Sequence, residues 1–289
     1  MKKMPKIAKS HLANLSLAVA MATTTCLLQA EDSVVNLLKN GGAETGDVSS
    51  WDAFQSVSSA AKEGKHAFVL GPKKQAISDD FIELDPEAQY ELSCFAMSQQ
   101  GGAKWLIGFD CYDAEQKRIL SEDVTIIEGT ETALTEEAVK GSKVLKIANG
   151  QSWAFEPGSS PKWGVVAFNV DDSGAFSDLP NRERSDWGIT AIRQVDGQWE
   201  VELKNPLRTD YPAGTKVRQH KTAGTCMWIG ELVAPTEWTQ TKGRRSGVSM
   251  VRGDSGKKFW PGTRFVKIFI LNQSDSDILF DDIVFRRLE

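Results

Sequence analysis

The chain has 289 residues, of which 39 are acidic and 34 are basic, so its formal net charge is −5 at neutral pH. Apolar residues make up 40% of the sequence, enough for the core of one large or two small domains. The acidic balance argues against nucleic acid as a partner, since phosphate binding needs clustered Lys and Arg, and the one basic run, Lys242 to Arg245, is interpreted as a solvated loop.

The first 30 residues have the pattern of a secretory signal peptide. Four lysines precede an apolar stretch of about a dozen residues, and the small Ala30 stands before two acidic residues. The stretch is shorter than the roughly 20 residues of a transmembrane helix, and no later segment is apolar enough to span a bilayer. We therefore expect removal of residues 1–30 and a bacterial protein that is secreted, periplasmic or at the cell surface. A retained membrane anchor and a lipoprotein acylated at Cys26 are the alternatives.

Three cysteines remain after removal of this leader. Cys94 and Cys111 lie in consecutive predicted strands and would face each other in a disulfide, which export permits. Buried free thiols that behave as small hydrophobes are the alternative for these two residues and for Cys226. No CxxC or His-rich spacing suggests a zinc site.

After the leader, the sequence predicts strands and turns. Aromatic and apolar residues at strand spacing fill 90–97, 105–112, 264–271 and 278–285, with Gly, Pro and Asp between the runs. This pattern is typical of an all-β sandwich or barrel. The one helical pattern is short and covers residues 135–139.

The middle of the chain has its own order of motifs. Residues 189–195 and 198–203 flank Asp196-Gly197, a favoured two-residue hairpin turn because both residues tolerate positive φ. The polar, turn-rich tract 169–186 is predicted to be a long loop. His220 is placed in a basic loop that follows the strands of this region.

Short motifs on both sides of the middle region carry a resemblance to a known family. Asn40-Gly41-Gly42-Ala43-Glu44-Thr45-Gly46 is followed by Ser50-Trp51, and the chain ends with Trp260-Pro261-Gly262-Thr263 and Phe280-Asp281-Asp282-Ile283. In this order the motifs resemble the CenC-type carbohydrate-binding modules, which have the galactose-binding-like jelly-roll fold. Ala43 departs from the family, which usually carries an aromatic residue there.

The resemblance implies a discontinuous domain. It covers residues 31–126 and 223–289, so residues 127–222 are predicted to be an inserted domain, similar to small β-barrel segments of extracellular proteins. Insertion at a loop tip costs little, because closure entropy grows slowly with loop length. The expected fold class is therefore an all-β jelly-roll sandwich with an inserted small β-barrel-like domain.

The most specific site that the resemblance implies is one for a structural calcium ion. Glu44 and Asp281 or Asp282 would supply carboxylate oxygens, and the backbone carbonyls near Gly46 and Lys65 would complete the site. Calcium prefers six to eight hard oxygen ligands of these kinds. The alternative is that the same carboxylates accept backbone hydrogen bonds.

Sugar binding would use the faces of aromatic rings, on which the C–H patches of pyranoses stack. Trp51 is expected in the core, like its family counterpart. The ligand-binding candidates lie in the jelly-roll segments: Trp105, Tyr112, Trp228 and Trp260. Four other tryptophans belong to the predicted insert: Trp153, Trp163, Trp187 and Trp199.

Catalytic patterns are scarce in the sequence. Neither a Gly-x-Ser-x-Gly elbow nor a phosphate loop is present, and no carboxylate pair stands out as a glycosidase site. The predicted function is therefore a non-catalytic protein that binds a polysaccharide or other glycan. A structural or adhesive β-protein without a sugar site is the first alternative, and a jelly-roll enzyme that degrades polysaccharide is the second.

Overall fold

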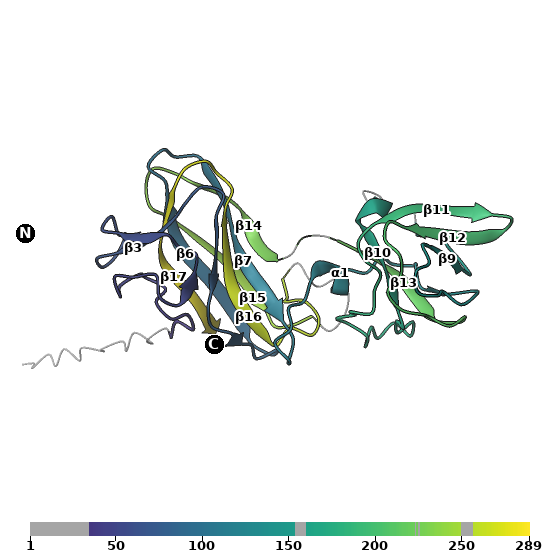
Figure 1. Ribbon diagram of the computed structural model, residues 1–289. Coiled ribbons are helices and arrows are strands. Elements are labelled where there is room, and N and C mark those ends of the chain that lie inside the picture. Colours follow the sequence, from purple (N-terminus) through teal and green to yellow (C-terminus); the bar gives the residue numbers. More distant parts are fainter. Residues whose placement is uncertain (1–34, 154–159, 223, 225, 250–256) are drawn as a thin grey trace, which may run out of the picture. The chain divides into compact units, whose positions relative to one another are not determined.

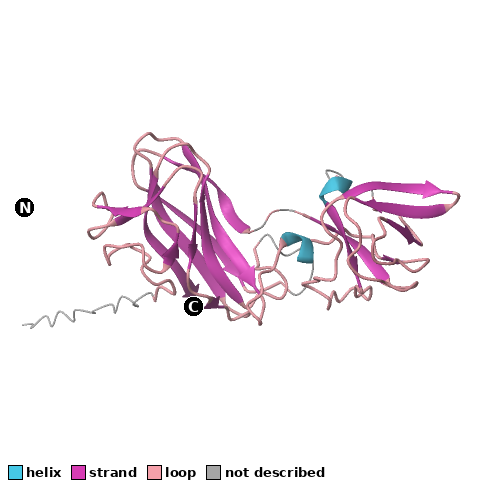
Figure 2. Ribbon diagram, viewed as in Figure 1, coloured by secondary structure: helices cyan, strands magenta, loops and turns pink. Residues whose placement is uncertain are grey.

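The structure is a computed structural model that describes residues 35–153, 160–222, 224, 226–249 and 257–289. The predicted signal peptide, with Cys26, lies outside these residues. Strands dominate the described residues (Figure 1, Figure 2). Within the described residues, no helix has the length and apolar character needed to cross a membrane.

Two antiparallel sheets form a sandwich. The first sheet has the order β1 (Trp51–Asp52), β4 (Gln75–Ser78), β16 (Phe265–Asn272), β7 (Ala103–Tyr112) and β14 (Met227–Ala234), and β5 (Ile82–Glu83) also pairs with β16. The second sheet has the order β15 (Thr239–Ser246), β6 (Gln89–Met97), β17 (Ile278–Leu288), β3 (Ala67–Leu70) and β2 (Ser56–Ser58). The prediction of an all-β jelly-roll sandwich is confirmed.

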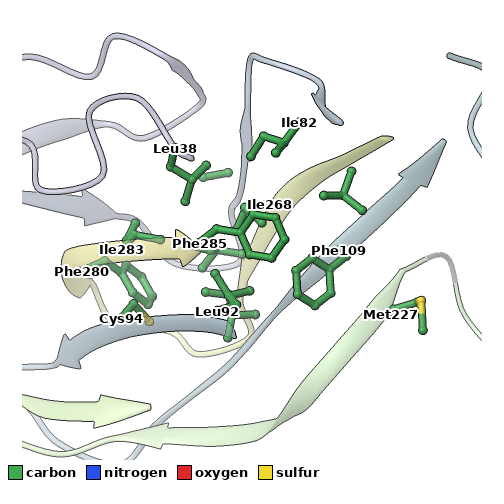
Figure 3. Packing of buried hydrophobic residues seen from close by; sticks show 14 of the residues in the cluster. Leu38, Ile82, Leu92, Cys94, Phe109, Met227, Ile268, Phe280, Ile283 and Phe285 are labelled. Atoms are coloured by element: carbon green, nitrogen blue, oxygen red, sulfur yellow. The ribbon is translucent and has the colours of Figure 1, made fainter. Parts of the chain in front are cut away.

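The core of the sandwich lies between the two sheets. Figure 3 shows Leu92 and Cys94 of β6 with Phe109 of β7 and Phe280 and Phe285 of β17. Each of these side chains is at most 1% exposed, and burial of one such aromatic ring stabilises the fold by about 2 kcal/mol. Packing of apolar side chains therefore supplies the main stabilisation of the sandwich.

Trp51 and the cysteines were predicted from the sequence to lie in or near this core. Trp51 is 4% exposed and its Nε1 donates to the Asn40 carbonyl at 3.2 Å, so its predicted core position is confirmed. Cys94, Cys111 and Cys226 are buried free thiols rather than disulfide partners. Cys94 belongs to the second sheet and Cys111 to the first, and burial raises the pKa of Cys111 to about 12.

The opening segment is hydrogen-bonded to the last strand. The Asn36 Nδ2 donates to the Ile283 carbonyl at 2.9 Å, and the Asn36 Oδ1 accepts from the Phe285 N–H at 3.0 Å. The Ile283 N–H in turn donates to the Gly41 carbonyl at 2.9 Å. A β-carbon at Gly41 would collide with the Ile283 carbonyl oxygen, so the close approach of the two backbones requires glycine there.

The segment between β7 and β14 forms two further antiparallel sheets around a hydrophobic cluster of its own. One sheet has the order β10 (Gly164–Phe168), β13 (Lys216–Lys221) and β8 (Thr132–Ala133), and the other has the order β11 (Ile189–Val195), β12 (Gln198–Leu203) and β9 (Val144–Ile147). The predicted hairpin is confirmed, with positive φ at Asp196 and Gly197. The domain limits at 126 and 223 stay a prediction.

The helical pattern at 135–139 was a wrong prediction. This segment begins with bends at residues 135 and 136, and the Ala138 N–H donates to the Tyr211 carbonyl at 2.8 Å. This isolated bridge to a distant part of the chain outweighs the weak local helical preference. The short helices of the described chain are α1 (Ser121–Val124) and the 3-10 turn η1 (Pro161–Trp163).

His220 lies in β13 rather than in a loop, and it belongs to a buried polar network. The fully buried Arg218 donates from Nε to His220 Nε2 at 3.0 Å and forms a 2.7 Å ion pair with Asp178. Because His220 Nε2 accepts, its proton sits on Nδ1, which donates to the Glu122 carbonyl at 2.8 Å. Burial and the charge of Arg218 lower the pKa of His220 to about 4, so it is neutral at pH 7.

The contact between Gly41 and the last strand can be tested with a matched pair of variants. Gly41→Ala is expected to lower the free energy of unfolding by about 3 kcal/mol, because a backbone segment must move to admit the methyl group. Gly42→Ala is the control, since its β-carbon would lie 3.7 Å from the nearest heavy atom, an ordinary contact. Its effect should stay below about 1 kcal/mol. Urea unfolding followed by tryptophan fluorescence measures both, and equal effects would contradict the proposed close approach.

His220 should make stability depend on pH. Its pKa is about 4 in the folded chain against 6.5 as a free side chain, so between these pH values only the unfolded state gains a proton. Stability is therefore lost as the pH falls from 6.5 towards 4, by about 3 kcal/mol for this residue. His220→Gln keeps a hydrogen-bonding side chain without this titration. Unfolding curves of both proteins are measured at pH 7 and pH 4.5. The difference in their free energies of unfolding should change between the two pH values, and an unchanged difference would refute the lowered pKa of His220.

Candidate functional site

The first sheet has an unusually aromatic outer face. Along β16, Val266, Ile268 and Ile270 point into the core, so the alternation of a strand turns the remaining side chains outward. These outward residues are Phe265, Lys267, Phe269 and Leu271, of which Phe269 is the most buried, at 5% exposure. They stand in a row across the middle of the sheet, since β16 lies between β4 and β7.

One end of this row is an aromatic cluster with a cation. Phe265 is paired in register with Tyr112 of β7, and both rings are half-buried. Phe81 is 36% exposed, packs edge-on against Tyr112 at 4.9 Å between ring centroids, and has the Lys267 Nζ over its face at 4.4 Å. Burial, followed by the negative charge of Asp110, raises the pKa of Tyr112 to about 12. Its phenol is therefore a hydrogen-bond donor at neutral pH.

The other end of the row is a tryptophan–phenylalanine pair. Phe269 and Trp228 lie on either side of Gly108 in the sheet register, and their ring centroids are 5.2 Å apart. The backbone of β14 approaches Gly108 closely, and a β-carbon there would collide with the Met227 carbonyl. Arg245 of β15 donates to the Trp228 carbonyl at 2.9 Å and fixes the bulge that aims this ring.

A buried charge lies between the two aromatic groups. Asp110 is opposite Lys267 in the register and is only 1% exposed. The Arg118 Nη2 donates to Asp110 Oδ1 at 2.7 Å, and the Cys226 thiol donates to the same oxygen at 2.9 Å. Burial disfavours the charged form of Arg118, but the neighbouring Asp110 outweighs this and raises the pKa of Arg118. The face thus offers fixed polar groups among aromatic rings. We call it the aromatic face, defined by Phe81, Tyr112, Phe265, Phe269, Trp228, Lys267, Asp110 and Arg118.

The four ligand-binding residues predicted from the sequence lie in two different places, the outer face of the first sheet and the core. Tyr112 and Trp228 lie on the aromatic face. Trp105 is 1% exposed and packs edge-on against Phe280 in the core at 5.0 Å, and Trp260 is 9% exposed in the same core cluster. Neither Trp105 nor Trp260 presents a ring to a ligand, so both predictions are corrected.

Sequence reasoning missed most of the aromatic face. Phe265 and Phe269 lie in a run that is apolar on both faces except at Lys267, so the pattern does not identify the two phenylalanines as outward residues. Phe81 lies outside the predicted strands. One signal was available: Tyr112 is seven positions after Trp105, an odd offset, so a regular strand places the two side chains on opposite faces.

The residues predicted for calcium lie around one loop. Glu44 accepts hydrogen bonds from the Lys65 and His66 N–H groups at 2.9 and 3.0 Å, and Asp281 accepts from the N–H groups of Lys62 and Glu63 at 2.7 and 3.0 Å. These backbone donors lower the pKa of Glu44. The two carboxylates therefore attach the loop at 62–66 to the opening segment and to β17, as the alternative interpretation has it.

The charge around this loop is unbalanced. Asp282 has its pKa raised by burial and by the neighbouring carboxylates of Glu63 and Asp281. Within the described chain, no three His, Cys, Asp or Glu side chains gather as a metal site. The Gly46 N–H donates to the Ala43 carbonyl at 2.9 Å, and the Lys65 N–H is taken by Glu44. The calcium site at these residues stays a prediction.

Comparison with known proteins finds similarity in structure only. No family model matches the chain, and no curated protein matches it. It is similar to TmCBM61 in complex with β-1,4-galactotriose, at 12% identity over 88% of this chain and 99% of that one, with a TM-score of 0.35. It is also similar to the CBM22-1 xylan-binding domain from Paenibacillus barcinonensis Xyn10C, at 8% identity over 89% and 96%, with a TM-score of 0.38. A family 16 carbohydrate-binding module has 14% identity over 88% and 100%, with a TM-score of 0.33.

Proposed function

We propose that the chain is an exported, non-catalytic carbohydrate-binding protein that holds a polysaccharide across its aromatic face. The observation that carries the proposal is the row of aromatic side chains on the outside of the first sheet. Five aromatic rings in two groups flank a paired carboxylate and guanidinium there. Sandwich sheets normally place polar residues outside, whereas here Phe81, Tyr112, Phe265 and Trp228 keep partly exposed rings on the outer face, and the 5% exposed Phe269 packs against Trp228. We infer that the exposed rings contact the ligand.

The arrangement suits a sugar chain rather than a compact ligand. Phe265 and Phe269 are four residues apart on one strand, which separates the two aromatic groups by about 13 Å along the sheet. Stacking on the rings satisfies the apolar faces of pyranoses, while hydroxyl groups need fixed donors and acceptors. Lys267, Arg118 and the Tyr112 phenol lie within the row and supply donors for those hydroxyls.

The aromatic face can be tested by single substitutions in affinity electrophoresis with gels that contain xylan, β-1,4-galactan or mixed-linkage β-glucan. We expect wild-type protein to be retarded by at least one of them, and Trp228→Ala to weaken that binding about tenfold by loss of one stacking ring. Val233→Ala on the same strand is the control, because Val233 is 58% exposed and is not one of the residues of the aromatic face. It should bind like wild type.

Two results would contradict the proposal. Absence of retardation in every gel favours a structural or adhesive protein without a sugar site. Release of reducing ends from the same polysaccharides would identify the enzyme alternative. Trp105→Ala adds a further check, because it should lower stability rather than affect the retention of folded protein.

We propose separately that the chain binds a structural calcium ion. Glu44 and Asp281 would hold the ion through carboxylate oxygens, and its charge would relieve the repulsion among Glu63, Asp281 and Asp282. Chelator is then expected to lower the melting temperature by several degrees, and added calcium to restore it. Glu44→Gln is the matched variant, since it keeps an acceptor for Lys65 but removes the charge. Melting curves of the wild type that do not change in chelator would leave the carboxylates as metal-free anchors of the loop.

A further inference from the structure

A pair of exposed tryptophans lies on the segment between β7 and β14, far in sequence from the aromatic face. Trp163 and Trp187 are 43% and 39% exposed, and their ring centroids are 5.3 Å apart with the planes inclined by 55°. Exposed indole rings are costly to leave in water, and two together make an apolar patch that a folded domain does not need for its own core.

The backbone holds these two rings side by side. Each tryptophan precedes a buried glycine, and the Gly188 N–H donates to the Gly164 carbonyl at 3.2 Å. A β-carbon at Gly164 would lie 2.8 Å from Gln219 Nε2, and one at Gly188 would lie 3.0 Å from Lys204 Cβ. Side chains are therefore disfavoured at both glycines, and the two Trp-Gly steps are fixed against each other.

Two cations accompany the rings. The Lys162 Nζ lies over the Trp163 ring at 5.3 Å, and the Lys204 Nζ lies over the Trp187 ring at 5.2 Å. Both lysines are exposed, and among the residues that the structure describes neither has a carboxylate ion pair. The nearby Asp186 is taken up by Arg208 at 2.8 Å. The patch is thus cationic on a chain whose net charge is −5.

We infer that Trp163, Trp187, Lys162 and Lys204 form a second binding site, the tryptophan platform, which takes an anionic polysaccharide. The inclined rings stack on two successive sugar units, and the ammonium groups meet the carboxylate or sulfate groups of the chain. The two ammonium groups can donate hydrogen bonds to any glycan, but only an acidic one adds charge attraction, and charge complementarity therefore favours the acidic class. The inference shares its ligand class with the proposed function but uses none of the same residues.

The test uses the full chain after removal of the predicted signal peptide, and it compares polymers that differ only in charge. Polygalacturonate is paired with its methyl-esterified form, and dextran sulfate with dextran. Isothermal titration at low salt is expected to show binding of at least one anionic polymer and at least tenfold weaker binding of its neutral counterpart. The charge-dependent part of the affinity should fall at high salt, because ions screen exposed charges.

Variants locate the site and separate it from the aromatic face. Trp163→Ala and Trp187→Ala should each weaken binding of the anionic polymer about tenfold, and Lys162→Gln with Lys204→Gln should abolish the preference for the charged polymer. Val144→Ala, at a 40% exposed apolar residue of β9, is the local control, and Trp228→Ala controls for the aromatic face. Both controls should bind the anionic polymer like wild type, and melting curves establish that each variant is folded.

The inference is overturned if neither anionic polymer binds, if charged and neutral polymers bind equally, or if the tryptophan variants bind like wild type. Loss of anionic binding in Trp228→Ala alone would assign that ligand to the aromatic face instead. Retention of neutral polysaccharide with no anionic binding would leave the proposed function standing and remove only the tryptophan platform.

Discussion

The last strand, β17, joins the two ends of the described chain, and the sandwich depends on that junction. Asn36 reaches Ile283 and Phe285 across nearly the whole sequence, while Asp281 and Glu44 hold the loop at 62–66 from two sides. These contacts close a loop of 247 residues, which is entropically unfavourable and must be offset by specific bonds. Hydrogen bonds that carboxylates accept from backbone N–H groups are charge-assisted and are among the stronger hydrogen bonds in proteins.

Close approach of two backbone segments at a glycine also shapes the aromatic face. Gly108 lies between Trp228 of β14 and Phe269 of β16 in the register, and the Met227 carbonyl fills the place of its β-carbon. The ring positions of Trp228 and Phe269 are thus set by the sheet rather than by flexible loops. A rigid surface of this kind lowers the entropy that is lost when a ligand binds.

Local signals in the sequence were sufficient only where the partners are also local, and the helical pattern at 135–139 failed because Ala138 pairs with the distant Tyr211. Asp196-Gly197 predicts its hairpin because the turn and both strands are contiguous, and Trp51 falls in the core as expected. The opposite holds where distant segments meet. Trp163 and Trp187 come together only because β10 and the start of β11 are bridged through Gly164 and Gly188. No pattern along the chain records that bridge. Phe265 and Phe269 were hidden for another reason, since their run is apolar on both faces except at Lys267 and does not identify them as outward residues.

The connection between β7 and β14 has an evolutionary consequence. These strands are antiparallel neighbours, and Asp110 near the end of one meets Cys226 just before the other at 2.9 Å. The long intervening segment therefore leaves and re-enters the sandwich at adjacent points, as the turn of an ordinary hairpin does. A lineage can lose this segment, or exchange it for another, while both strands keep their register. The sandwich and the segment between its strands are thus free to diverge at different rates.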